Sequence, residues 1–127
     1  MNDTEMRALV ERYLDAYNRM DVPAMLQTVH RDVTFRNVSG GVVTARADGI
    51  GELRALAEQS VSLFSERRQD ILSFACDGPR ALVSIRFRAV VADNLPSGLK
   101  KGAVLELSGR SEFEFRNGAI WTITDVS

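Results

Sequence analysis

The sequence has 127 residues, of which 45% are hydrophobic and 26% charged, a composition typical of one globular domain spanning residues 1–127. Its formal net charge of −1 excludes the strongly basic surface with which proteins bind nucleic acid or an anionic membrane. It has no apolar run of the roughly 18 residues that span a bilayer, and its single cysteine and single histidine are too few for a structural zinc site.

Three segments within the first 64 residues carry helical periodicity. Asn2 and Glu5 form a capping-box pattern that predicts a first helix. Its apolar stripe, with helical spacing, consists of Met6, Leu9, Val10, Tyr13, Leu14, Tyr17 and Met20. Asp21 and Pro23 predict a short second helix, whose apolar face ends at Val29 and whose C-terminus is capped by His30. A third helix, capped by Asp48, has the stripe Ile50, Leu53, Leu56, Ala57, Val61 and Phe64.

The other segments have the period of two that is typical of strands. Residues 33–38 predict a strand, and the turn at residues 39–41 leads into a short strand over residues 42–46. After the third helix we predict four strands, over residues 69–76, 80–93, 104–116 and 119–126. Residues 94–102 form a long loop, and Asn117-Gly118 is a strong hairpin signal. Gly109 lies in mid-strand and predicts a bulge or bend.

This order of elements predicts an α+β fold. Strands with one apolar face need helices to cover that face. We therefore expect a cone-shaped, strongly bent antiparallel sheet covered by about three N-terminal helices. Long strands have to bend, and a bent sheet closed by helices leaves an interior pocket.

Several local signatures, taken in order, resemble the nuclear transport factor 2-like superfamily, in particular its SnoaL-like and ketosteroid isomerase-like branches. They are LVERYLDAYN (residues 9–18), DVPAM (21–25), RDVTF (31–35), FEFRNG (113–118) and the Ile120-Trp121 pair. The resemblance covers nearly the whole chain and implies the same fold. This fold hosts isomerases, dehydratases, epoxide hydrolases, cyclases and non-catalytic modules, so function must be argued from the site.

The mechanism of ketosteroid isomerase transfers only in part to this sequence. Tyr13 falls at the family's tyrosine donor, but Asn37 replaces the aspartate base and Ser111 replaces the protonated aspartate. An amide cannot act as a general base, and a hydroxyl donates more weakly to an oxyanion. Ala57 stands where a tyrosine supports the donor. The resemblance therefore implies no steroid-type isomerisation by the two-aspartate mechanism.

Polar residues in apolar, inward-facing rows are the candidates for a site. Asp125 shares the face of Trp121 and Ile123, where apolar surroundings raise a carboxyl pKa, and is our candidate acid/base. Tyr13 is the second catalytic candidate, a phenol that polarises a ligand carbonyl. The predicted substrate-binding residues are Asn37, Tyr17, Ser111, Phe35, Phe64, Phe87, Phe113 and Trp121.

Each polar candidate also has a purely structural interpretation. Tyr13 could be a core aromatic, and Asp125 could belong to a strand end of shifted register. Asn37 could bond the turn at residues 39–41, and Ser111 could simply make room for neighbours. These alternatives stay open in the sequence.

The leading hypothesis is an enzyme that carries out isomerisation, cyclisation or dehydration on a hydrophobic carbonyl compound, without metal or organic cofactor. The alternatives are a non-catalytic module that binds or senses an apolar ligand, and a structural dimerisation domain with a filled core. The partner expected is a hydrophobic small molecule, with no nucleic acid and no membrane.

The resemblance implies a homodimer through the outer sheet face, where Arg86 and Arg88 oppose Glu106, Glu112 and Glu114. The lone Cys76 and the acidic N-terminal residues, unlike a signal peptide, favour the cytoplasm.

Overall fold

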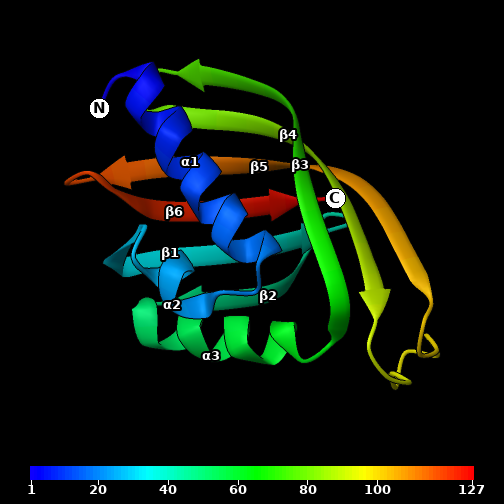
Figure 1. The fold of residues 1–127 in the computed structure, drawn as a ribbon. Coiled ribbons are helices and arrows are strands. Elements are labelled where there is room, and N and C mark those ends of the chain that lie inside the picture. The colour runs from blue at the N-terminus through cyan, green and yellow to red at the C-terminus, as the bar shows by residue number, and fades with distance from the viewer.

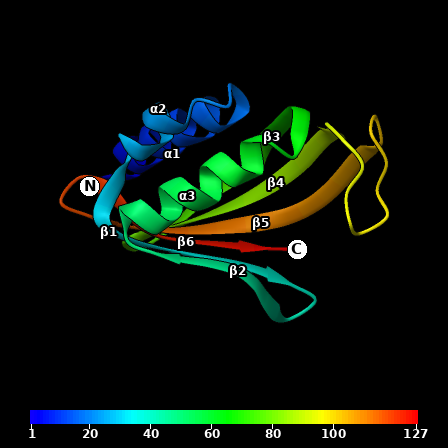
Figure 2. The same ribbon diagram turned by 90° about the horizontal axis from the view of Figure 1, so that it is seen from below.

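The computed structural model describes residues 1–127 and contains three helices and six strands in the predicted order. The elements are α1 (Asp3–Asn18), α2 (Val22–Leu26), β1 (Val29–Ser39), β2 (Val42–Asp48), α3 (Ile50–Val61), β3 (Phe64–Asp77), β4 (Arg80–Val91), β5 (Val104–Arg116) and β6 (Ala119–Val126). All three helices lie over one face of a single curved sheet (Figures 1 and 2). The predicted α+β fold is confirmed.

Helix α1 begins as its sequence predicts. Asn2 Oδ1 accepts a hydrogen bond from the Glu5 backbone N–H at 2.8 Å, and Glu5 Oε1 accepts one from the Asn2 N–H at 3.0 Å. These two bonds satisfy N–H groups that the first helical turn leaves free. The apolar stripe then packs on the sheet, where Phe113, Ile120 and Ile123 are completely buried. Burial of each such side chain contributes about 1.5–3 kcal/mol, which holds α1 against the strands.

The helix ends on either side of the β1–β2 hairpin differ from the prediction. Helix α2 ends at Leu26, and His30 lies in β1, where its Nδ1 accepts a hydrogen bond from the Asp32 N–H at 3.0 Å. The N-cap of α3 is Gly49, because Asp48 is the last residue of β2 and pairs with Arg36 at 3.0 Å. The salt bridge holds Asp48 in the β1–β2 hairpin. At both positions the local sequence pattern is typical of a helix end, but the residue belongs to a strand of the β1–β2 hairpin.

The sheet order is β2-β1-β6-β5-β4-β3, and one of its pairings is parallel. Strands β1 and β6 run in the same direction, whereas the other four pairs are antiparallel, as predicted. The all-antiparallel expectation was therefore wrong at β1–β6. Alternation in a sequence shows which side chains share a face, but not which strand lies beside it or in what direction. Because β6 lies between β1 and β5, Asp125 has Asn37 as its register partner on one side and Ser111 on the other.

A register shift removes Trp121 from the predicted face. Glu114 pairs with Thr122 and Phe115 pairs with Ile120, so Trp121 has no partner on β5. An extra residue in one strand reverses the alternation beyond it. Ile120 is therefore the residue buried with Ile123, and Trp121 lies instead under the guanidinium of Arg116, 3.6 Å from ring centroid to Cζ.

Gly109 serves a different purpose from the predicted bulge. The β4–β5 register is continuous through the Ile85–Gly109 pair. A Cβ atom at position 109 would lie 2.5 Å from the carbonyl oxygen of Val126. The glycine therefore allows the end of β6 to approach β5 closely, directly beside Asp125.

The outer face of the sheet carries no helix (Figure 2). Arg88 lies 3.8 Å from Glu106 there, one of the predicted cross-strand pairs, whereas Arg86 is opposite Ser108. An exposed pair of this kind is worth less than about 1 kcal/mol. None of the three helices has the length and apolar character needed to cross a lipid bilayer.

Candidate functional site

Two adjoining cavities lie on the helix-covered side of the sheet. The inner cavity has a volume of about 370 Å³, within the range typical of small-molecule sites. Its wall is mostly apolar and consists of Tyr13, Tyr17, Met25, Phe35, Asn37, Ala45, Leu53, Leu56, Ala57, Gln59, Ser60, Leu63, Phe64, Arg67, Gln69 and Asp125. A filled core, as in the structural hypothesis, is not what the fold contains.

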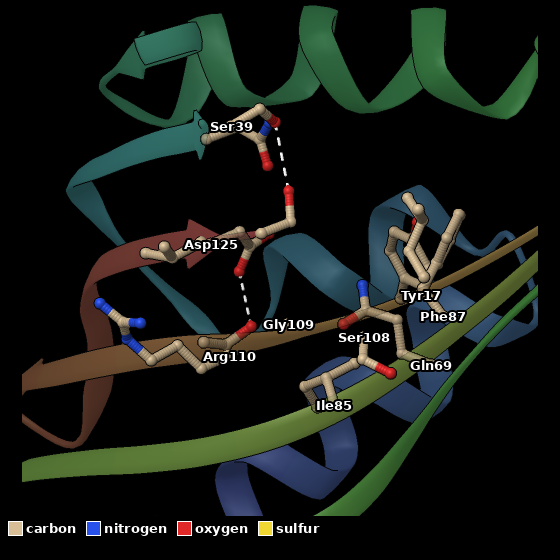
Figure 3. A pocket seen from close by; sticks show the side chains of 14 residues that line it. Tyr17, Ser39, Gln69, Ile85, Phe87, Ser108, Gly109, Arg110 and Asp125 are labelled. Carbon is tan, nitrogen blue, oxygen red and sulfur yellow. Dashed lines mark hydrogen bonds between the residues drawn. The ribbon is translucent and has the colours of Figure 1, made fainter. Parts of the chain in front are cut away.

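The second cavity, of about 220 Å³, lies over the middle of β5 and the end of β6 and is more polar (Figure 3). Its walls include Ser39, Ser108, Ser111 and the backbone of Gly109. Four residues line both cavities, namely Tyr17, Asn37, Gln69 and Asp125. The polar side chains therefore gather where an apolar compartment meets a polar one.

Asp125 is the carboxylate at this junction. Ser111 Oγ donates a hydrogen bond to Asp125 Oδ1 at 2.6 Å, drawn as a dashed line from Asp125 in Figure 3. Burial of the carboxyl group raises the pKa of Asp125 to about 6, while the Ser111 hydrogen bond lowers it. A carboxyl group with a pKa near neutrality can both accept and return a proton. Ser111 is thus more than a space-filling residue, because it orients this carboxylate.

Asn37 approaches Asp125 from the other side, on β1. Its Nδ2 donates to Thr44 Oγ1 at 2.8 Å and reaches Ser39 Oγ at 3.4 Å. The structural interpretation of Asn37 is therefore correct in part, since the side chain is anchored to the hairpin. Its Oδ1 accepts no hydrogen bond from the protein, so the amide retains an acceptor for a ligand.

Tyr13 and Tyr17 line the cavity from α1. The ring of Tyr13 packs edge-on against Phe113, with 6.1 Å between centroids. Its hydroxyl makes no hydrogen bond to the protein. Burial, and then the nearby Asp125, raise the pKa of Tyr13 above its usual value, so the phenol stays protonated and can donate. Burial likewise raises the pKa of Tyr17, an effect that the nearby Arg67 opposes.

The structure brings most of the predicted site residues together. Tyr13, Tyr17, Phe35, Asn37, Phe64 and Asp125 line the inner cavity, and Phe87 and Ser111 line the second cavity. Phe113 lies behind Tyr13, almost wholly buried in the core. Trp121 lines neither cavity, for the reason of register given above.

Arg67 and Gln69, both on β3, are among the lining residues that sequence reasoning missed. The predicted strand began at Gln69, and Phe64 was placed in α3. Which of residues 64–68 face the cavity was therefore not assigned. In the structure β3 begins at Phe64, and Arg67 and Gln69 face inward opposite Ala89 and Phe87. Alternation counted from Phe64 would have placed Arg67 on the opposite face, and the register shift between Phe64 and Glu66 is what brings both residues to the cavity. No three residues among His, Cys, Asp and Glu come together as metal ligands anywhere in the chain.

A curved sheet closed by helices over a largely apolar cavity, with two tyrosines and a half-buried aspartate in its wall, defines a protein of the nuclear transport factor 2-like fold. More narrowly, the chain belongs to the SnoaL-like domain family, whose model matches residues 10–123. The resemblance of the sequence to this family is thereby confirmed.

Three solved structures illustrate the fold. A candidate polyketide cyclase from Xanthomonas campestris superposes with a TM-score of 0.84 at 22% identity, covering 100% of this chain and 93% of the other. An LEH-like epoxide hydrolase from M. tuberculosis has a TM-score of 0.77 at 19% identity, covering 97% and 82%. A protein of ketosteroid isomerase-like fold from Catenulispora acidiphila, in complex with trimethylamine, has a TM-score of 0.75 at 12% identity, covering 92% and 82%. At these identities the likeness concerns the fold alone, and none of the curated proteins compared with the sequence matches it.

Proposed function

We propose that this protein is an enzyme of the SnoaL-like type that moves a proton on a hydrophobic carbonyl compound, as in isomerisation, cyclisation or dehydration. The observation that carries the proposal is Asp125, a carboxyl group with a pKa of about 6 in the wall of a largely apolar cavity. Retaining an ionisable carboxyl group there costs folding free energy. A proton-transfer role explains why it is present.

In the proposed reaction the carbonyl group lies beside Tyr13, which donates a hydrogen bond to its oxygen. The Asp125 carboxylate removes a proton from the carbon next to the carbonyl, and the electron pair moves onto the oxygen to form an enolate. The Tyr13 hydroxyl stabilises the negative charge that develops. Asp125, now protonated, returns the proton to another carbon or to a leaving group. Ser111 holds the carboxylate in position through its hydrogen bond.

Hydrogen exchange at carbon tests this step without knowledge of the natural substrate. The probe is 2-tetralone, an apolar ketone with acidic protons beside its carbonyl, dissolved in D2O with the protein and followed by NMR. We expect the wild type to accelerate deuterium incorporation above the buffer rate and Asp125→Asn to lose the acceleration. Undiminished exchange in Asp125→Asn would contradict the role given to this residue.

A non-catalytic binding module is the second candidate. It is favoured by Asn37 and Ser111, which stand where the related isomerases have their two aspartates. The test is native mass spectrometry of the protein from its own host, followed by extraction of any bound compound. A ligand recovered chemically unchanged after incubation, with no exchange in D2O, would favour binding over catalysis.

We also propose that two copies of the chain form a homodimer through the outer sheet face, as the family resemblance implies. The outer sheet face is open, and Leu72 and Val104 are exposed on β3 and β5. Association through this face would cover such apolar side chains. Sedimentation equilibrium would give the mass in solution, and a monomer at all concentrations would contradict this proposal.

A further inference from the structure

Arg67 is a buried cation for which the chain supplies no anion. Its side chain comes from the inner face of β3 and the residue is only 5% exposed. None of the ion pairs of the structure includes it. Buried arginines are normally paired, because a guanidinium does not become neutral by losing a proton.

The neighbours of Arg67 satisfy only part of its guanidinium. Nε donates to the backbone carbonyl of Tyr17 at 3.0 Å, and Nη1 donates to Ser60 Oγ at 3.2 Å. The Tyr17 ring lies against the plane of the group, 3.7 Å from Cζ to the ring centroid. Nη2 is buried and has no hydrogen-bond partner, and it is the only buried side-chain nitrogen or oxygen in the chain without one.

A structural role for Arg67 accounts for two of its three nitrogens. The bonds from Nε and Nη1 join β3 to the ends of α1 and α3, so they hold the fold together. They do not account for Nη2, whose unmet hydrogen bonds and uncompensated charge both favour an incoming acceptor. Burial also lowers the pKa of Arg67, as expected when no anion offsets the loss of water.

Arg67 forms part of the wall of the inner cavity, together with Asp125. No ion pair joins the two charged groups, and the hydrogen bond that Asp125 accepts comes from Ser111. The cavity thus has a proton-transfer carboxylate and a separate unpaired cation, with apolar side chains in the rest of its wall. A ligand complementary to this wall has an apolar body and one anionic oxygen.

We propose that Arg67 binds an anionic oxygen of the ligand, so that the substrate is an apolar molecule carrying a carboxylate or an ionised enol. The anionic oxygen accepts a hydrogen bond from Nη2, and the rest of the ligand fills the apolar part of the inner cavity. This inference deepens the proposed function by naming the substrate class, and it rests on that proposal only in taking the same cavity as the ligand site.

Calorimetric titration with matched probes tests the inference on the wild-type protein. The probes are 2-naphthoate, the anion of 2-hydroxy-1,4-naphthoquinone, and neutral 2-naphthamide, which has the same apolar body without the charge. We expect at least one of the anions to bind about 10- to 100-fold more tightly than the amide, the range for one charge-assisted hydrogen bond. The anion that binds more tightly shows whether the site prefers a carboxylate or an enolate. Equal affinities for all three, or binding by neither anion at millimolar concentration, would overturn the inference.

Substitution of Arg67 assigns the preference to its guanidinium. We expect Arg67→Met to lose the preference for the anions while binding the amide as before, and Arg67→Lys to keep part of it, because an ammonium retains the charge without the planar fork. The control is Arg68→Met, which removes the same charge from the exposed face of β3. An anion preference that survives in a folded Arg67→Met would overturn the inference. Should that variant not fold, the comparison of probes on the wild type decides alone.

These outcomes separate the inference from the proposed function. Deuterium exchange of 2-tetralone depends on Asp125 and needs no anion. Exchange without any anion preference would therefore refute only the role of Arg67. An anion preference dependent on Arg67, with no exchange of any bound carbonyl compound, would refute only the proton transfer.

Discussion

The side-chain amide of Asn18 pairs with both backbone groups of Gln69: Nδ2 donates to the carbonyl oxygen at 3.1 Å, and Oδ1 accepts from the N–H at 2.7 Å. Strand β3 is an edge strand, and here one side chain takes the place of a neighbouring strand. Asn18 is the last residue of α1 and follows Tyr17, whose carbonyl accepts from Arg67. The end of α1 is therefore joined to the strand that brings Arg67 and Gln69 into the cavity.

Replacement of Asn18 by alanine should weaken this junction. The variant leaves the N–H and C=O of the half-buried Gln69 without partners, which costs about 1–3 kcal/mol of unfolding free energy. The matched control is Asn94→Ala, which loses one exposed hydrogen bond to the Lys101 N–H and should cost less than about 0.5 kcal/mol. Urea denaturation measures both. Equal losses in the two variants would contradict the role assigned to Asn18.

The buried carboxyl group of Asp125 should lower stability as pH rises. Its pKa is about 6 in the folded state and 3.8 when unperturbed, so between these values the folded chain binds more protons than the unfolded chain. The free energy of unfolding is therefore unaffected by this group below about pH 4. It falls as pH rises through about 6, by up to about 3 kcal/mol in total. We expect Asp125→Asn to be more stable than wild type at pH 8 and equal to it near pH 3.5. Parallel stability curves from pH 3.5 to 8 would contradict the raised pKa.

The hydroxyl of Ser111 should hold the pKa of Asp125 down. Its hydrogen bond at 2.6 Å favours the ionised form, so Ser111→Ala should raise the pKa above the wild-type value of about 6. NMR titration of the labelled Asp125 carboxyl carbon measures this directly. Ser108→Ala, on the same strand but without a bond to Asp125, should leave the titration unchanged. A pKa that stays the same or falls in Ser111→Ala would show that the bond does not stabilise the carboxylate.

The hydroxyl of Tyr13 should matter for turnover and not for stability. It has no hydrogen-bond partner in the protein, so Tyr13→Phe removes no folded-state bond and should change unfolding free energy by less than about 1 kcal/mol. If the phenol stabilises an enolate, the rate of tetralone exchange should fall by about 100-fold or more. Thermal denaturation and deuterium exchange on the same sample compare the two effects. A stable variant with full exchange activity would remove Tyr13 from the mechanism.

The close approach at Gly109 predicts an asymmetry between two glycines. An alanine Cβ at position 109 would meet the Val126 carbonyl oxygen at 2.5 Å, so Gly109→Ala should cost about 1–3 kcal/mol and displace the end of β6. Gly51, in α3, has open space around the same atom, and Gly51→Ala should stabilise by about 0.5–1 kcal/mol. Denaturation curves compare the two. A Gly109→Ala variant as stable as the wild type would show that the strands can part at no cost.

Much of the fold could be predicted because local patterns agree with the packing. The Asn2–Glu5 capping box, the stripe of α1 and the turn at Asn117-Gly118 each appear in the structure where the sequence predicts them. Strand identity could be read from alternation for β4 and β5, whose register is unbroken. These signals depend only on neighbours in sequence, so a single sequence contains them.

The features of the fold and of the site that could not be predicted depend on contacts between residues distant in the sequence. The parallel β1–β6 pairing decides that Asn37 lies beside Asp125, and nothing local in either strand specifies it. One unpaired residue in β6 reverses the expected face of Trp121. Arg67 was missed because the predicted strand began at Gln69, and a register shift between Phe64 and Glu66 sets which residues at the start of β3 face inward. Only the tertiary structure shows that this arginine lies without an anion beside the cavity.

The place of β6 between β1 and β5 also has a consequence for how the chain folds. Strands β2 and β1 join the other half of the sheet only through β6, and the contact that closes it links Ser39 to Ser127, 88 residues apart. Pairings over such separations are slow, since the entropy of closing the intervening loop is lost before the contacts form. Hairpins such as β4–β5 can form early, but no species lacking the β1–β6 pairing contains the cavity. The appearance of ligand binding during refolding should therefore mark the last cooperative step.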